Sequence, residues 1–111
     1  MDDKLLNFGK ELVPVELPEI PDEKVFVRSL TTGERLVLEE VKQATRGLIG
    51  DHEFVYLGTF RADGSRRFTA TTIRELDGRI AARLALAVLK VSGLTREAQE
   101  EAAKKSEASP S

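Results

Sequence analysis

Residues 79–92 read RIAARLALAVLKVS and carry the strongest helical pattern in the chain. At the helical rise per residue, this stretch is about 21 Å long. Four apolar residues at helical spacing form one stripe that we expect to face the core: Ile80, Leu84, Val88 and Val91. Three cations form a narrow stripe on the opposite side: Arg79, Arg83 and Lys90. The stretch therefore predicts an amphipathic helix against which a small core can pack.

A second apolar flank lies between the two stripes of this helix. It consists of four residues: Ala82, Ala85, Leu86 and Leu89. Small residues let another backbone approach closely, so the flank is a candidate surface for a partner or for a second copy of the chain. Packing of the same flank inside one monomer is an equally good interpretation, and both stay open. Leu36 joins this candidate partner-binding set because it falls among the charged positions of another predicted helix.

The helix over 79–92 is followed by a stop signal. Gly93 stands where a left-handed residue closes a helix, and Leu94 occupies the position that packs back on the last turn in a Schellman motif. Residues 95–105, TREAQEEAAKK, predict a final helix whose apolar content is three alanines. Such a helix has little to bury, so we expect weak tertiary anchoring. Residues 106–111 are expected to form a disordered tail.

Another helix is predicted to begin where the chain reads TTGE, at residues 31–34. Thr31 and Glu34 have the spacing of a capping box, in which the Thr hydroxyl accepts from the Glu amide while the Glu side chain accepts from the Thr amide. Glycines at 47 and 50 are expected to end this helix near Arg46. Four apolar residues fall on one side and predict its buried face: Val37, Val41, Ala44 and Leu48.

The N-terminal part of the chain predicts extended structure. Prolines alternate with apolar residues over residues 1–23, which suits an extended segment rather than a helix. Residues 24–30, KVFVRSL, alternate their side chains and predict a short strand. We expect a single domain over 24–105, of the α+β class: mostly helical, with a short β-hairpin or small antiparallel sheet.

The middle of the chain predicts the hairpin. Residues 53–60, EFVYLGTF, are apolar and β-branched and predict a strand. Asp63-Gly64 is a typical hairpin turn pair, because Gly accepts a positive φ without steric cost, and residues 65–71 are then the partner strand. TIRE at 72–75 repeats the capping-box spacing and predicts a single helical turn.

The composition excludes most kinds of catalytic and metal site. The chain has 111 residues, no cysteine and a single histidine, His52. Thiol nucleophiles, thiolate metal sites and two-histidine metal sites are therefore absent, and no glycine-rich phosphate loop is present. We interpret His52 as a loop residue at the start of a strand rather than as a catalytic base. We therefore expect no enzymatic activity and no cofactor.

The charge balance argues against nucleic acid as the main partner. Lys and Arg total 17 against 19 Asp and Glu, which gives a net charge of −2, whereas phosphate-binding domains are strongly basic. Arg61, Arg66 and Arg67 flank the predicted hairpin turn, and cations there are typical of a solvated sheet edge. A nucleic-acid-binding regulator that uses these arginines, with nearby Arg74, stays an alternative. No apolar run is long enough to span a membrane, and the acidic start does not look like a signal peptide.

Two segments resemble the tail assembly chaperones of long-tailed bacteriophages and their prophages. VRSLTTGER at 27–35 is similar to the strand-to-helix entry V-R-x-L-T-x-x-E-R of that family. SGLTREAQEEAAKK at 92–105 is similar to its close N-G-L-x-x-x-A-x-E-x-A-x-K, with Ser92 in place of the usual Asn. The likeness covers about residues 14–105, and its motifs are capping signals, which specify a fold better than an activity.

The resemblance implies a non-catalytic, oligomeric interaction protein of the host bacterial cytoplasm. Members of the family hold the tape measure protein in soluble form and recruit tail tube subunits during tail assembly, and they are absent from the mature virion. A chaperone for a long helical client needs apolar surface diluted by charge, which the flank of the 79–92 helix and Leu36 provide. The alternative within phage biology is a small structural component that stays in the tail of the virion.

Overall fold

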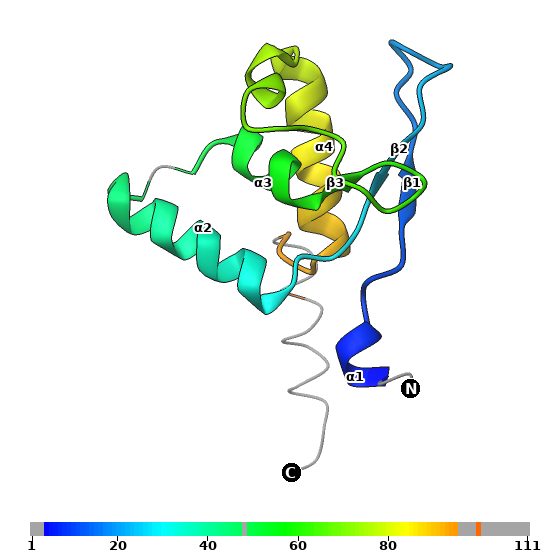
Figure 1. Cartoon of the computed structure of the whole chain (residues 1–111). Coiled ribbons are helices and arrows are strands. Elements are labelled where there is room, and N and C mark those ends of the chain that lie inside the picture. Colours follow the sequence, from blue (N-terminus) through cyan, green and yellow to red (C-terminus); the bar gives the residue numbers. More distant parts are fainter. Residues whose placement is uncertain (1–3, 48, 96–99, 101–111) are drawn as a thin grey trace.

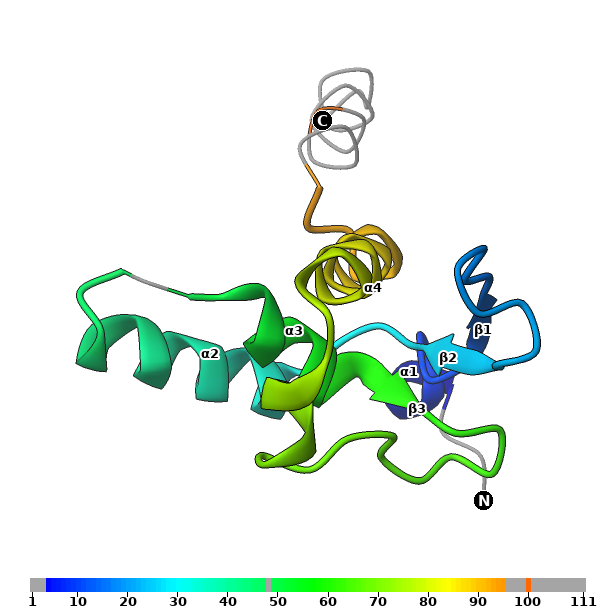
Figure 2. The ribbon, with the colours of Figure 1, turned by 90° about the horizontal axis from the view of Figure 1, so that it is seen from above.

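The computed structural model describes residues 4–47, 49–95 and 100 (Figure 1). Its helices and strands follow in this order: α1 (Lys4–Asn7), β1 (Val13–Val15), β2 (Val25–Val27), α2 (Thr32–Ala44), α3 (Asp51–Gly58), β3 (Thr59–Phe60), the 3₁₀ turn η1 (Thr72–Glu75) and α4 (Gly78–Val91). Seen from above, α3 and α4 lie between α2 on one side and the strands on the other (Figure 2). The predicted α+β class, mostly helical with a small antiparallel sheet, is confirmed.

The sheet has three antiparallel strands in the order β1-β2-β3. Val25 and Val27 of the central strand point to the same face, and both are buried, at 2% and 0% exposure. Val25 packs in one core cluster with Leu84 of α4, and Val27 packs in a second cluster with Val88, one turn further along the same helix. The inner face of the sheet is therefore covered by α4, as its amphipathic pattern predicted.

The segment before β2 is not uniformly extended as expected for residues 1–23. Residues Lys4–Asn7 form the short helix α1, and Val13–Val15 form β1, whose residues pair with Val25–Val27. Leu17 follows β1 and is buried at 4% exposure in the cluster that contains Leu84. This segment thus contributes an edge strand and a core residue to the same sheet.

The strand predicted over 53–60 is wrong. Residues Asp51–Gly58 form α3, and only Thr59 and Phe60 are in a strand. A short apolar run cannot be assigned to helix or strand from its periodicity, and here the start signals decide for a helix. Gly50 is an extended N-cap, and Asp51 and Glu53 place negative charge in the first turn, where the helix dipole favours it.

The partner strand predicted over 65–71 is also absent, because only an isolated bridge joins Phe60 to Arg66. The turn itself is where it was predicted. Gly64 has φ +88°, and the Asp63 carboxylate accepts a hydrogen bond from the Ser65 amide at 2.8 Å. The chain therefore reverses after β3 without building a second full strand.

Gly58 lies at the junction of α3, β3, β2 and α4. A Cβ on this glycine would lie 2.6 and 2.7 Å from the two methyl carbons of Val88, so α3 and α4 approach each other too closely for any side chain here. The carbonyl of Gly58 accepts a hydrogen bond from the amide of Arg28, just after β2, at 3.2 Å. Thr59, the next residue, begins β3.

The helix α2 begins with the predicted capping box. Thr31 is the N-cap, its hydroxyl accepts from the Glu34 amide at 3.2 Å, and the Glu34 carboxylate accepts from the Thr31 amide at 2.9 Å. The helix ends at Ala44, slightly before the predicted Arg46, and Arg46 has a positive φ of 58°. The local signals at the start of this helix were therefore sufficient to place it.

The predicted buried face of α2 is wrong. Glu34 and Leu38 are buried, whereas Val37 is 42% exposed, Ala44 is exposed and Val41 is only half-buried. Leu48 lies outside the described residues. The helix projects away from α3 and α4 (Figure 1), so it buries only a narrow stripe near its first turns.

Glu34 is buried with two arginines that fix the first turn of α2. Its carboxylate oxygens accept from Arg28 at 2.8 and 3.2 Å and from Arg66 at 3.1 Å. Burial raises the pKa of Glu34, but the hydrogen bonds from Arg28 and the Thr31 amide, with the positive charge of Arg28 and a further bond from Arg66, outweigh it. The pKa therefore lies below that of an ordinary glutamate.

The chain from residue 72 to residue 95 largely follows the sequence signals. η1 is the predicted single turn, although Thr72 accepts from the Thr69 amide instead of forming the predicted capping box. After α4, Gly93 has φ +70°, and the amide of Leu94 bonds to the carbonyl of Leu89 at 2.8 Å, which confirms the Schellman motif. The hydroxyl of Ser92 accepts from the amide of Leu30 at 3.0 Å.

Most of the helix predicted over 95–105 lies outside the described residues, as does the tail predicted over 106–111. Among the described residues, no helix has both the length and the apolar character needed to cross a membrane.

Replacing Glu34 with Gln is expected to lower the free energy of unfolding by about 1.5–3 kcal/mol at pH 7, since the ionised partner of two arginines is lost while the cap acceptor is kept. Because folding lowers the pKa of Glu34, its charge stabilises the protein above the ordinary pKa of about 4.5. The difference between wild type and variant should therefore shrink as the pH falls below that value. Urea unfolding measures both effects.

The control for this variant is Glu39→Gln, an exposed glutamate of the same helix, which should change the stability by less than about 0.5 kcal/mol. Equal effects of the two variants at pH 7 would contradict a structural role for the Glu34 pairs.

Replacing Gly58 with Ala is expected to destabilise the fold by about 1–3 kcal/mol, because the new methyl group overlaps Val88. Gly78→Ala at the start of α4 is the matched control. No atom lies within 4 Å of a Cβ there, so alanine should be neutral or stabilise by up to about 1 kcal/mol. The midpoint of thermal unfolding should fall for Gly58→Ala and stay unchanged or rise for Gly78→Ala. A Gly58→Ala protein as stable as the wild type would argue against the close approach of α3 and α4.

Candidate partner-binding surfaces

The apolar flank predicted on α4 is only partly accessible. Ala82 is exposed, Leu86 is 60% exposed and Leu89 is half-buried, and their spacing of four and three residues places them on one side of the helix. Ala85, which the sequence placed with them, is 1% exposed and packs in the cluster of Leu84. Ala85 is therefore a core residue, and the α4 strip consists of Ala82, Leu86 and Leu89.

Leu36 lies at the edge of a separate groove between α2, the start of α3 and the residues that follow α4. Leu36 is 58% exposed, and the groove, of about 400 Å³, also contains Leu38, Ile49, Phe54 and Leu94. Charged residues of α2 line the same groove: Arg35, Glu39 and Lys42. The groove is apolar with charged residues along one wall. It lies beside α2, which is on the opposite side of α3 and α4 from the strands (Figure 2).

Among the described residues, the most exposed large apolar side chains are ones that the sequence pattern had not singled out. Leu5, Leu6 and Phe8 are 88%, 68% and 89% exposed, on and just after α1. Gly9 then turns the chain with φ +79°, and its carbonyl accepts from the Ser29 amide at 3.2 Å. The signal was present, since LLNF places three large apolar side chains within four residues of an otherwise polar start. We call residues 4–10 the α1 arm.

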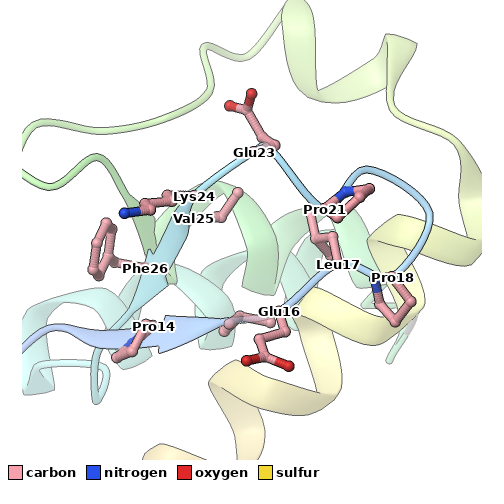
Figure 3. A pocket seen from close by; sticks show the side chains of 10 residues that line it. Pro14, Glu16, Leu17, Pro18, Pro21, Glu23, Lys24, Val25 and Phe26 are labelled. Carbon is pink, nitrogen blue, oxygen red and sulfur yellow. The ribbon is translucent and has the colours of Figure 1, made fainter.

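A hollow of about 640 Å³ lies on the β1–β2 hairpin and its connecting loop (Figure 3). Leu17 and Val25 of the core form part of its lining, together with Pro14 and Phe26, which face each other across the two strands. Its remaining lining residues come from the loop and its ends: Val15, Glu16, Pro18, Pro21, Glu23 and Lys24. We call this the proline hollow.

Two consecutive turns give the loop of the proline hollow its shape. The amide of Ile20 bonds to the carbonyl of Leu17 at 2.9 Å, and the amide of Glu23 bonds to the carbonyl of Ile20 at 3.0 Å. Pro18 and Pro21 each follow the first residue of a turn, the position for which the fixed φ of proline is suited. The hollow is therefore held open by a stiff loop.

Ion pairs tie this loop to the rest of the molecule. Glu19 pairs with Arg83 of α4, and Glu23 pairs with Arg67 at 3.0 Å. The hydrogen bond from Arg83 is the main reason that the pKa of Glu19 is lowered. In contrast, Glu16 is exposed on the hollow's rim.

The arginines that suggested a nucleic-acid site form hydrogen bonds within the protein, although Arg61 and Arg66 are exposed residues. Arg66 donates to Glu34 and to the carbonyls of Tyr56 and Leu57, and Arg67 donates to Glu23. Arg61 donates to the carbonyl of Arg66 at 2.9 Å. The bonds of Arg66 and Arg67 tie this segment to α2, α3 and the β1–β2 loop, and the bond of Arg61 closes the turn itself.

His52 is in a helix and not, as predicted, in a loop at the start of a strand. It lies on the exposed first turn of α3, and its Nε2 is 3.0 Å from a carboxylate oxygen of the next residue, Glu53. Within residues 4–47, 49–95 and 100, no group of His, Asp and Glu side chains is arranged to hold a metal ion. The features of the described surface are thus apolar strips, a groove and a hollow.

No family model matches the chain, and no curated protein matches it in sequence. Among solved structures, the chain is similar to the tail assembly chaperone of bacteriophage HK97, with a TM-score of 0.59 and 24% sequence identity. The match covers 79% of this chain and 94% of the HK97 protein. The chain therefore has the fold of that chaperone, and the fold implied by the sequence resemblance is confirmed.

Replacing Leu86 with Glu is expected to shift the sedimentation of the protein toward the monomer, because a carboxylate in the α4 strip opposes apolar contact between copies. The side chain is 60% exposed, so circular dichroism should show an intact fold. Ala70→Glu adds the same charge at an exposed position outside the helices and should leave the mass unchanged. An unchanged mass for Leu86→Glu would refute self-association through this strip.

Proposed function

We propose that this protein is a phage tail assembly chaperone, a non-catalytic interaction protein that holds the tape measure protein and helps to recruit tail tube subunits. The observation that carries the proposal is the fold shared with the HK97 tail assembly chaperone over most of both chains. The two capping motifs that resembled the family, at Thr31–Glu34 and after α4, are formed in this fold.

The exposed apolar surface supports the holding role on physical grounds. Leu36 is on α2, Leu86 is on α4 and Phe8 follows α1, and each has charged residues within four positions in the sequence. A long helical client presents apolar side chains at helical spacing, which a groove or a helix strip of this kind can cover. Dispersal among charges keeps each patch small, so the chaperone itself resists aggregation.

Self-association and place of action follow from the same proposal. A long client needs many copies along its length, so we expect a homo-oligomer that works in the cytoplasm of the host bacterium. Because the chaperone leaves when the tail is complete, it should be absent from the mature virion. A small structural tail component would instead be found in purified particles.

The test is co-expression with the tape measure protein of the same phage. The wild-type chaperone is expected to raise the soluble fraction of the tape measure protein and to co-purify with it, and tail tube protein should join the complex when added. The variant Leu36→Glu/Leu86→Glu should co-purify much less, because both apolar patches then carry a charge. Ala62→Glu/Ala70→Glu, with two charges at exposed sites outside the helices, is the control.

Failure of the wild-type protein to bind or solubilise the tape measure protein would overturn the proposal. Recovery of the chain from purified virions would favour the structural alternative.

A further inference from the structure

The α1 arm is unusually exposed for a segment with large apolar side chains. Phe8 is 89% exposed, while Phe60 and Phe68 are buried and Phe26 and Phe54 are half-buried. Leu5, on α1, is 88% exposed. Burial of side chains of this size is strongly favourable in water, so the arm is a candidate for contact with another surface.

The proline hollow has the properties of a surface that receives such an arm. It is mainly apolar and about 640 Å³ in volume, within the range of pockets that bind whole ligands. The turns at Pro18 and Pro21 hold its shape, so little conformational entropy is lost on binding. Pro14 in the edge strand β1 lacks an amide hydrogen, so side-chain docking is favoured over addition of a further strand.

The arm and the hollow of one chain lie at opposite ends of the molecule. Figure 1 shows α1 at the lower end and the loop between β1 and β2 at the upper end. The arm is tied at its own end by the bond between the Gly9 carbonyl and the Ser29 amide. An arm that reaches a proline hollow from this position must therefore enter the hollow of another copy.

The charges of the two surfaces are complementary at Lys10 and Glu16, and the hollow is also lined by one cation, Lys24. The arm reads KLLNFGK, with Lys4 and Lys10 on either side of its apolar residues and no acidic residue between them. Figure 3 shows the carboxylates of Glu16 and Glu23 on opposite sides of the hollow. Glu23 is paired with Arg67, so Glu16 is the carboxylate that we assign to the arm. Asp2 and Asp3 precede Lys4 in the sequence, which makes Lys10 the clearer cation to test.

We propose that the α1 arm of one copy docks in the proline hollow of a second copy, with Leu5 and Phe8 in the hollow and Lys10 beside Glu16. The two surfaces differ, so the contact is head-to-tail. However many copies join an open assembly, one arm remains unoccupied at one end and one hollow at the other. This contact uses neither the α4 strip nor Leu36, and it does not depend on a tail protein as client.

Cross-linking between two single-cysteine variants tests the contact directly, because the natural chain has no cysteine. Asn7→Cys is beside the apolar residues of the arm, and Lys24→Cys lines the hollow; both positions are exposed. A short bismaleimide should join an affinity-tagged Asn7→Cys chain to an untagged Lys24→Cys chain. Arg74→Cys, exposed on η1, replaces Lys24→Cys as the control and should give only background.

Adding Phe8→Ser to the Asn7→Cys chain is expected to weaken the association roughly ten- to a hundredfold, because a Phe side chain loses its site of burial. Phe8 is 89% exposed in the monomer, so this change should leave the fold intact, as circular dichroism would show. Lys10→Glu in the Asn7→Cys chain and Glu16→Lys in the Lys24→Cys chain should each lower the yield, and mixing the two reversed chains should restore it.

Cross-linking that is equal with Arg74→Cys, or unaffected by Phe8→Ser, would overturn the proposal. So would efficient cross-linking of Asn7→Cys chains to one another, which would place arm against arm. If the Asn7→Cys thiol is protected from the maleimide only when tape measure protein is present, the arm binds the client instead of a second copy. A chaperone that binds its client but gives no cross-link above background would refute this contact and leave the proposed function standing.

Discussion

The close approach of α3 and α4 at Gly58 is the constraint on which the rest of the fold depends. The methyl groups of Val88 on α4 occupy the space that a side chain at Gly58 on α3 would need. The Val88 side chain therefore packs against the backbone of α3. The same residue ends α3, leads into β3 and accepts a hydrogen bond from Arg28 after β2. One position thus sets the distance between the helices and the register of the sheet beside them.

Glu34 provides a second fixed point, this time electrostatic. Its carboxylate joins the exit from β2, through Arg28, to the segment after β3, through Arg66, while it also completes the cap of α2. Because α2 is anchored at this end, the rest of the helix projects outward and leaves Leu36 and Val37 exposed. An anchored helix with exposed apolar residues is suited to contact with other chains.

The exposed apolar surfaces are what this small core leaves uncovered. The clusters around Leu84 and Val88 use one side of α4, and its other side keeps Leu86 in solvent. The loop with Pro18 and Pro21 is stiff enough to keep a hollow open, and Phe8 of the α1 arm is 89% exposed. The proposed binding to other copies and to a client would use these surfaces.

The sequence by itself determined the local features: the cap of α2 at Thr31, the extent of α4, the turn at Gly64 and the Schellman motif at Gly93. Each depends on hydrogen bonds or backbone conformations within a few residues. The residues that determine it therefore all lie in one short stretch of sequence. These capping motifs also carried the resemblance that the fold comparison confirmed.

Only the tertiary structure decided which side of each element is covered. It made 51–58 a helix, buried Ala85 and Leu38, and left Val37 and Phe8 exposed. These outcomes depend on partners far away in the sequence, such as Leu17 and Val25 in the cluster that includes Ala85. An apolar residue has the same appearance in a sequence whether its partner lies in the same core or in another chain, because burial is a property of the packed pair.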